Sequence, residues 1–154
     1  LQQLVQQFDM PVIVSTHPRT RQRLEALKVE GLDSRIQFLK PFGFFDYVKL
    51  QIEAYCVLSD SGTITEEASL LGLPAITIRN AHERPEGMDA GVLVMSGLKP
   101  AAVLDAVKVV VAQHAAAGAV KRPVADYAGG AVSQKVLRIV LSYIDFVNRV
   151  VWSK

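Results

Sequence analysis

Residues 55–71 read YCVLSDSGTITEEASLL and hold, in one short stretch, the features that decide the fold. The apolar run 55–59 predicts a strand buried on both faces. Small polar residues follow, and residues 63–71 then predict a helix that Gly72 and Pro74 end. A strand that passes through a small-residue turn into a helix is the repeating unit of α/β proteins.

The same alternation runs through the rest of the chain. Four further runs of β-branched and apolar residues predict strands, at 11–15, 36–39, 75–78 and 92–95. Apolar residues at helical spacing predict further helices, at 1–8, 19–30, 45–53, 100–117 and 131–152. We therefore expect one Rossmann-like, three-layer α/β domain around a parallel sheet of about five strands, with residues 118–130 as the longest loop.

Composition excludes several classes of protein. The 154 residues are 50% hydrophobic and 21% charged, which fits one domain with its own core. A net charge of +2 and the lack of a basic run argue against nucleic acid as a partner. No apolar stretch reaches the roughly 20 residues of a membrane span, and the first residues lack the pattern of a signal peptide. The lone Cys56 fits a reducing cytoplasm.

The turn between residues 59 and 63 is the strongest candidate site. Ligands of parallel sheets bind beyond the carboxyl ends of the strands, and a helix start presents backbone N–H groups to an anion. Ser61, Gly62 and Thr63 therefore predict a phosphate or diphosphate site, in which Gly62 lets the anion approach the backbone. The alternative is an ordinary helix cap without a ligand.

Two adjacent glutamates on the following helix are expected to differ in role. Ile64, Ala68 and Leu71 mark the face that packs on the core. Glu67 lies close to that face and needs a polar partner, for which a ribose diol would serve. Glu66 is expected to face solvent, because neighbouring residues on a helix point about 100° apart.

Three other polar or aromatic clusters follow strand ends. Residues 79–87 hold five ionisable groups, of which Arg84 is the best phosphate ligand and His82 a weaker candidate, although a solvated loop can be as polar. Residues 15–21 hold His17, Arg19 and Arg21, where a histidine is more often a structural hydrogen-bonding group than a catalyst. Residues 42–47 hold four aromatic residues, one of which could stack on a base.

Together these residues resemble the non-hydrolysing UDP-N-acetylglucosamine 2-epimerase family over nearly the whole chain. The most specific matches are Asp60-Ser61-Gly62 followed by Glu66-Glu67, and then residues 83–86, Glu-Arg-Pro-Glu, after the next strand. The resemblance implies the second domain of a two-domain GT-B-type fold, with the substrate in the cleft between the domains. The N-terminal half, which this chain would lack, is then its main protein partner, and the full-length enzyme is expected to be a homodimer.

The resemblance also implies a role for each candidate residue. Ser61, Gly62, Thr63 and Arg84 correspond to the residues that bind the diphosphate, and Glu67 to the glutamate that binds ribose. Tyr47 corresponds to the aromatic residue that contacts uracil. His17 corresponds to the active-site histidine, although the family continues His-Arg-Arg-Glu-Asn and this chain reads His-Pro-Arg-Thr-Arg.

The implied reaction inverts C2 of a UDP-2-acetamido sugar by elimination and re-addition of UDP, without a metal or nicotinamide cofactor. The carboxylates that act at C2 belong to the family's first domain, so this chain alone is expected to be inactive. Residues 82–89 and 16–20 look most like the branch that forms UDP-N-acetyl-L-fucosamine from a 6-deoxy-L-talose precursor for capsule or O-antigen. The alternatives are the donor-binding half of a GT-B-type glycosyltransferase and a non-catalytic nucleotide-sugar sensor or scaffold domain.

Overall fold

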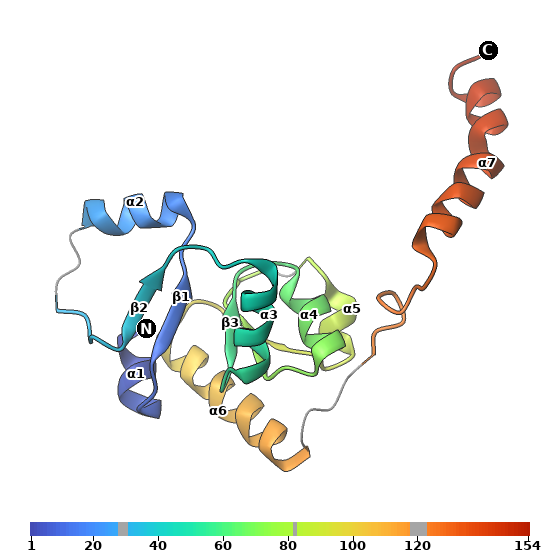
Figure 1. Cartoon of the computed structure of the whole chain (residues 1–154). Helices are drawn as coiled ribbons and strands as arrows, with labels where there is room; N and C mark the ends of the chain where they lie inside the picture. Colours follow the sequence, from blue (N-terminus) through green and yellow to red (C-terminus); the bar gives the residue numbers. More distant parts are fainter. Residues whose placement is uncertain (28–30, 82, 118–122) are drawn as a thin grey trace. The chain divides into compact units, whose positions relative to one another are not determined.

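The chain forms two compact units, residues 1–122 and 123–154, and the computed structural model describes residues 1–27, 31–81, 83–117 and 123–154. The first unit alternates helices and strands, as Figure 1 shows. Its elements are α1 (Gln2–Phe8), β1 (Val12–Ser15), α2 (Pro18–Leu27), β2 (Ile36–Leu39), α3 (Phe44–Glu53), β3 (Val57–Ser59), α4 (Ile64–Leu71), β4 (Ala75–Thr77), α5 (Pro85–Asp89), β5 (Val94–Met95) and α6 (Pro100–Ala117). The predicted α/β alternation is confirmed. The predicted end of α2 and the first part of the loop 118–130 lie outside the described residues.

All strand pairs in the first unit are parallel, but the strands form two sheets. β1 pairs with β2, where Val12 is opposite Ile36. β3, β4 and β5 pair in that order, where Leu58 is opposite Ile76 and Ile76 is opposite Val94. The prediction of a single sheet of about five strands is therefore wrong. Local sequence predicts each strand, whereas pairing depends on how segments distant in sequence approach one another.

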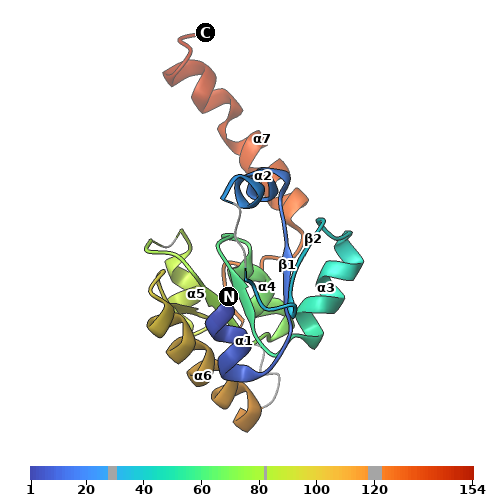
Figure 2. The same cartoon turned by 90° about the vertical axis from the view of Figure 1, so that its left-hand side faces the viewer.

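The core of the first unit lies between β4 and α6. Ile76, Ala106 and Val107 are buried there, and residues of α1, of β3 and of the position just before β3 pack around them: Leu4, Phe8, Leu58 and Cys56. α6 and α3 lie on opposite sides of the strands, as Figure 2 shows. Helices on both faces of parallel strands confirm the layered, Rossmann-like architecture.

α6 needs a separate comment because of its composition. In the described part of the chain it is the one helix long and apolar enough to cross a membrane, by length and composition alone. Ala106 and Val107 are nevertheless buried against the β4 strand. A core helix of a soluble α/β protein passes the same test, so α6 is weak evidence for a membrane span.

The end of α4 follows from two residues. Gly72 adopts a left-handed conformation with φ of 71°, which a residue without a Cβ adopts at little cost. Its N–H donates to the carbonyl of Ala68 at 2.9 Å. This is the usual C-terminal cap of a helix, and Pro74 then leads directly into β4. The sequence prediction of this helix end is confirmed.

The second unit contains one long amphipathic helix, α7 (Val132–Val150). Apolar residues recur along it at helical spacing, as predicted for residues 131–152. Within the described residues none of its side chains is buried, and Leu141 and Tyr143 are 64% and 58% exposed.

Candidate functional site

The turn between β3 and α4 presents hydrogen-bond donors at an exposed helix start. The hydroxyl of Ser61 lies 3.0 Å from that of Thr63 and accepts a hydrogen bond from the Thr63 amide at 3.4 Å. The amides of Gly62 and Ile64 donate to no other described residue. Amides without a partner beside hydroxyl groups at a helix start are the groups that an anion would meet, so the anion site stays a prediction.

The guanidinium of Arg84 lies against this turn, close to Gly62. A Cβ on Gly62 would lie 2.0 Å from Nη1 of Arg84, which is far too close for the two to coexist. The missing side chain of Gly62 therefore makes room for the Arg84 guanidinium in this structure. The close approach of an anion to Gly62 stays a prediction, and the structure adds the arginine as a close neighbour of this glycine.

Arg84 is held by an ion pair with Glu66. Nε of Arg84 donates to Oε1 of Glu66 at 2.7 Å, and both side chains are only about 30% exposed. The other carboxylate oxygen of Glu66 is buried and accepts no hydrogen bond from a described residue. The prediction that Glu66 faces solvent is wrong. α5 packs beside α4 and brings Arg84 to Glu66, which the helical periodicity of α4 alone does not reveal.

A second arginine links the loops that follow β3 and β4. Arg79 donates to Glu83 at 2.8 Å and to the backbone carbonyl of Asp60 at 3.3 Å. The hydrogen bond from Arg79 lowers the pKa of the Glu83 carboxyl, and the same bond raises the pKa of Arg79. The other carboxylate oxygen of Glu83 lies 3.7 Å from Nη1 of Arg84. Sequence reasoning placed Arg79 and Glu83 in a polar loop but assigned them no role.

On the other side of α4, Glu67 lies among residues of α3. Nε2 of the buried Gln51 donates to Oε2 of Glu67 at 2.5 Å. Tyr47 lies one turn before Gln51 on α3. Burial raises the pKa of the Tyr47 hydroxyl, and the negative charge of nearby Glu67 raises it further. Tyr47 and Glu67, the candidates for uracil and ribose, are thus near enough for the charge of Glu67 to act on the Tyr47 hydroxyl. Gln51 was missed, because a glutamine on a helix carries no distinctive sequence signal.

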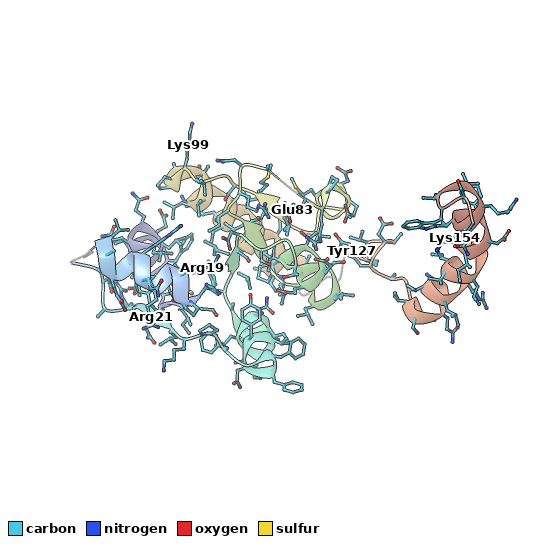
Figure 3. All side chains as sticks on the ribbon, turned by 90° about the horizontal axis from the view of Figure 1, so that it is seen from above. Arg19, Arg21, Glu83, Lys99, Tyr127 and Lys154 are labelled. Atoms are coloured by element: carbon cyan, nitrogen blue, oxygen red, sulfur yellow. The ribbon has the colours of Figure 1, made fainter. Side chains whose placement is uncertain are left out.

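His17 lies at the carboxyl end of β1, apart from these contacts. It is exposed, and its Nδ1 accepts a hydrogen bond from the amide of Arg19 at 3.3 Å. Arg21 donates from Nη2 to the carbonyl of Phe38 at 3.3 Å. Figure 3 shows Arg19 and Arg21 on α2, away from Glu83. No hydrogen bond or ion pair of the described residues connects His17 with Glu66, Glu67 or Arg84. His82 lies outside the described residues.

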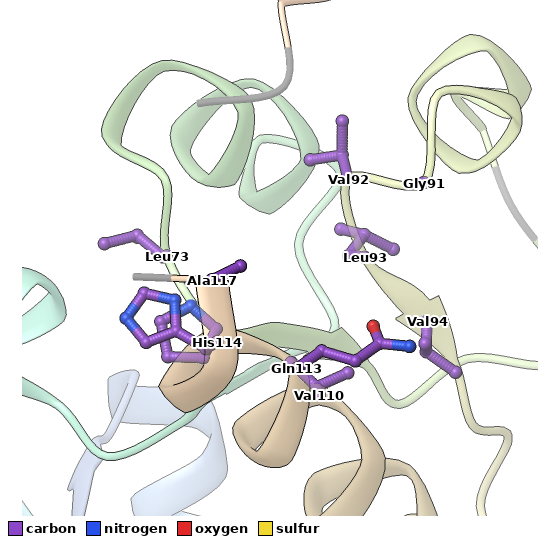
Figure 4. Close-up of a pocket in the computed structure, with 10 residues that line it drawn as sticks. Leu73, Gly91, Val92, Leu93, Val94, Val110, Gln113, His114 and Ala117 are labelled. Carbon is purple, nitrogen blue, oxygen red and sulfur yellow. The ribbon is translucent and has the colours of Figure 1, made fainter. Parts of the chain in front are cut away.

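Among the described residues of the first unit, surface depressions lie at both ends of the strands. One is lined at the carboxyl ends of β3 and β4 by residues that include Ser61, Gly62, Arg79, Glu83 and Arg84. The other, shown in Figure 4, lies at the amino ends of β4 and β5 and is lined by residues that include Leu73, Gly91 and His114. Only the first has the arginines and helix-start donors that suit an anion.

The chain is similar to known proteins over most of its length. The pattern of the UDP-N-acetylglucosamine 2-epimerase family matches residues 1–141. The UDP-N-acetylglucosamine 2-epimerase of Methanocaldococcus jannaschii is 33% identical over 110 residues, which are 70% of this chain and 30% of that protein. The enzyme of the same name from Yersinia pestis is 31% identical over 115 residues, which are 75% of this chain and 30% of that protein. The chain thus spans about a third of the length of these relatives.

Solved structures lead to the same family. The structure of UDP-N-acetylglucosamine 2-epimerase from Rickettsia bellii is 56% identical and superposes with a TM-score of 0.88, covering 99% of this chain and 42% of that one. The Methanocaldococcus jannaschii enzyme, solved in complex with UDP-GlcNAc and UDP, is 28% identical with a TM-score of 0.75, covering 91% of this chain and 38% of that one. Both similarities extend over nearly all of the present chain.

Proposed function

Since the chain belongs to the UDP-N-acetylglucosamine 2-epimerase family, we propose that it is the UDP-binding, C-terminal half of a UDP-2-acetamido-sugar 2-epimerase. One observation supports this proposal: α4 begins at a turn with partner-free amides close to Arg84, and one turn later it carries a carboxylate near a tyrosine. A diphosphate, a ribose and a base follow one another in UDP in the same order.

The diphosphate lies at the start of α4 in this proposal. The amides of Gly62 and Ile64 and the hydroxyls of Ser61 and Thr63 donate to its oxygens, and Arg84 contributes the positive charge. Guanidinium groups bind phosphate through a planar fork of N–H donors. Nη1 of Arg84 already lies above the backbone of Gly62, so a phosphate at the turn would be within reach of both.

The nucleoside extends along α4 toward α3. Glu67 accepts hydrogen bonds from the ribose hydroxyls, and Gln51 fixes the orientation of its carboxylate. Tyr47 offers a half-buried aromatic ring to uracil. His17 is the proposed active-site histidine, at a second strand end, where it would meet the sugar rather than the nucleotide.

The reaction inverts C2 by elimination and re-addition. The C2 proton leaves and the C1–O bond to UDP breaks, which forms a 2-acetamidoglycal. UDP then adds back at C1, while the proton returns to the opposite face of C2. Negative charge develops on the departing diphosphate, so donors fixed around it lower the barrier. General acid and base groups act at C2, and we place them in the domain outside this chain.

The substrate, the location and the assembly complete the proposal. Residues 82–89 and 16–20 favour a 6-deoxy sugar, UDP-2-acetamido-2,6-dideoxy-L-talose, ahead of UDP-N-acetylglucosamine. We place the enzyme in the cytoplasm, in the synthesis of precursors for capsule or O-antigen. The N-terminal half is the partner of this chain, and the full-length protein is a homodimer. The residues of this chain carry the nucleotide contacts without a metal or cofactor.

The test is solvent exchange at C2. Full-length protein is incubated in deuterated water with UDP-N-acetylglucosamine or the 6-deoxy-L-talose substrate, without a sugar acceptor, and the sugar protons are followed by NMR. An epimerase replaces the C2 proton by deuterium and equilibrates the two C2 epimers. A glycosyltransferase leaves both the proton and the configuration unchanged, and that outcome would refute the proposal.

A further inference from the structure

We propose that Glu66 is a positioning residue, which holds the Arg84 guanidinium above Gly62 in the orientation that meets the diphosphate. The inference rests on the proposed function, in which Arg84 binds phosphate. Glu66 itself would not touch the nucleotide. It would act only through the arginine.

The contact is made at the one nitrogen that fixes the direction of the guanidinium. Nε of Arg84 donates to Oε1 of Glu66 at 2.7 Å. Nε joins the guanidinium to the aliphatic part of the side chain, so this bond fixes the plane of the guanidinium. The terminal nitrogens Nη1 and Nη2 can still donate to a ligand. Nη1 lies where a Cβ of Gly62 would be. The phosphate-binding edge of Arg84 is thereby turned toward the turn before α4.

Glu83, in the loop before α5, is a second carboxylate close to Arg84. Oε2 of Glu83 lies 3.7 Å from Nη1 of Arg84, while Oε1 of Glu83 is bonded to Arg79. Glu83 is 56% exposed, whereas Glu66 is 32% exposed. Exposed ion pairs contribute little free energy, so the less exposed Glu66 restrains the Arg84 side chain more than Glu83 does.

The environment of Glu66 fits a role in orientation better than one in stability. One of its carboxylate oxygens is buried and receives no hydrogen bond within the described residues. A buried acceptor without a donor costs free energy. A side chain selected only to stabilise α4 would not be expected to carry that cost, whereas a carboxylate that orients a cation needs its charge.

The two adjacent glutamates of α4 then act on different parts of the ligand. Glu66 contacts Arg84 and so influences diphosphate binding, whereas Glu67 contacts Gln51 and lies close to Tyr47 on the nucleoside side. This division explains how two carboxylates one residue apart both serve one ligand. It also assigns a role to Glu66, which the sequence analysis expected only to face solvent.

The first experiment needs no ligand. The Nε–H signal of Arg84 is assigned in ¹⁵N NMR spectra of the 154-residue chain by its absence from Arg84→Lys. A bond to Glu66 predicts slow exchange of this proton with water in the wild-type chain and an exchange rate at least about tenfold higher in Glu66→Gln, because the charge-assisted bond is lost. Glu53→Gln, a change at an exposed residue of α3, is the control and should leave the signal unchanged. Equal exchange in wild type and Glu66→Gln would overturn the proposal.

The second experiment is a double-mutant cycle with UDP as the probe. Glu66→Gln should weaken UDP binding about three- to tenfold in the wild-type chain, the usual worth of a partly exposed charged hydrogen bond. In an Arg84→Ala background the same change should have no effect on UDP binding, because Glu66 acts only through Arg84. An equal loss in both backgrounds, with the amide spectrum of the folded chain retained, would show that Glu66 acts independently of Arg84.

The two experiments separate this inference from the proposed function. If wild-type chain binds no UDP while Glu66 still protects Nε–H of Arg84, the positioning contact exists and the proposed function is wrong. If wild-type chain binds UDP and Glu66→Gln binds it equally well, the proposed function stands and the positioning role is wrong.

Discussion

In the proposed function, Glu67 is the residue that bears most directly on nucleoside binding. Its carboxylate is held by Gln51 at 2.5 Å, beside Tyr47, and is only partly exposed. A glutamine at this position can still bond with Gln51 through its own amide oxygen, so the contact between α3 and α4 should survive. Replacing Glu67 by Gln therefore tests the charge of the residue while leaving its packing in place.

We expect Glu67→Gln to weaken UDP binding by about 1.5–3 kcal/mol, the usual contribution of a hydrogen bond to a charged group. Calorimetric titration with UDP and with its 2′,3′-dideoxy analogue measures this. If Glu67 binds the ribose, the analogue should bind wild type and variant equally. A variant that loses as much affinity for the analogue as for UDP would place Glu67 elsewhere in the site.

Cys56 is the second residue whose chemistry is open to measurement. Burial beside the core raises the pKa of its thiol from 9.0 to about 12. Between these two values the unfolded chain loses the thiol proton and the folded chain keeps it. The contribution of Cys56 to stability is therefore fully present below pH 9 and is lost as the pH rises toward 12.

The expected result is a free energy of unfolding that falls more steeply above pH 9 in the wild-type chain than in Cys56→Ala. Denaturant unfolding at pH 8, 9 and 10 gives the free energy of unfolding of both proteins. Tyrosines and lysines titrate alike in the two, so their effect cancels in the difference. Parallel pH dependence in the two proteins would mean that the Cys56 thiol titrates normally.

Among single residues, those that the sequence predicts best are the ones whose role depends on local chain geometry. The positions of Ser61, Thr63 and Gly72 follow from a strand, a turn and a helix that are adjacent in sequence. Glu66 was predicted wrongly because its partner, Arg84, lies 18 residues away. The partner of a polar side chain can lie far away in the sequence, so the periodicity of its own helix does not predict that partner.

At the scale of elements, the turn before α4 and the start of α5 form one structural unit. α5 begins at Pro85, directly after Arg84, and packs beside α4. Gly62 is the point of closest approach between them. Any side chain at this position must displace the Arg84 guanidinium, because its Cβ would lie 2.0 Å from Nη1.

Gly62→Ala should therefore weaken UDP binding about tenfold or more, comparable to the loss of one charged hydrogen bond, while the chain stays folded. Isothermal titration with UDP and thermal unfolding measure the two effects. Gly43→Ala is the matched control, since its Cβ would meet no atom closer than 3.6 Å. Unchanged UDP affinity in Gly62→Ala would show that Arg84 does not need its position above the turn.

Most elements could be predicted from the sequence within a few residues, and the exceptions have physical causes. α5 was not predicted, because five residues are too few to show a helical period. β5 is two residues long, shorter than the predicted strand 92–95, because its hydrogen bonding to β4 is limited to Val94 and Met95.

At the scale of the whole molecule, the division into two sheets explains which candidate site residues lie close together and which do not. β3, β4 and β5 place the turn before α4 beside the loop of Arg79 and Arg84, and that part of the predicted site comes together. β1 and β2 form a separate pair and carry His17. The role of His17 therefore stays a prediction, and so do the roles of Tyr47 and Glu67 in binding the nucleoside.

The chain alone should not epimerise UDP-2-acetamido sugars, because we place the acid and base groups for C2 in a domain outside it. Purified chain is incubated in deuterated water with UDP-N-acetylglucosamine and the C2 proton is followed by NMR, beside full-length protein as a positive control. Loss of the C2 proton with the chain alone would place the complete catalytic apparatus within these 154 residues.

The central claim is that UDP binds at the start of α4, and a titration of the ¹⁵N-labelled chain with UDP tests it most directly. We expect the amides of Ser61, Gly62 and Thr63 to shift first, with a dissociation constant between about 1 μM and 1 mM, or about −8 to −4 kcal/mol, because we place the other side of the cleft in a domain outside this chain. Shifts confined to Leu73, Gly91 and His114, around the depression at the opposite ends of the strands, or no shifts at millimolar UDP, would contradict the account.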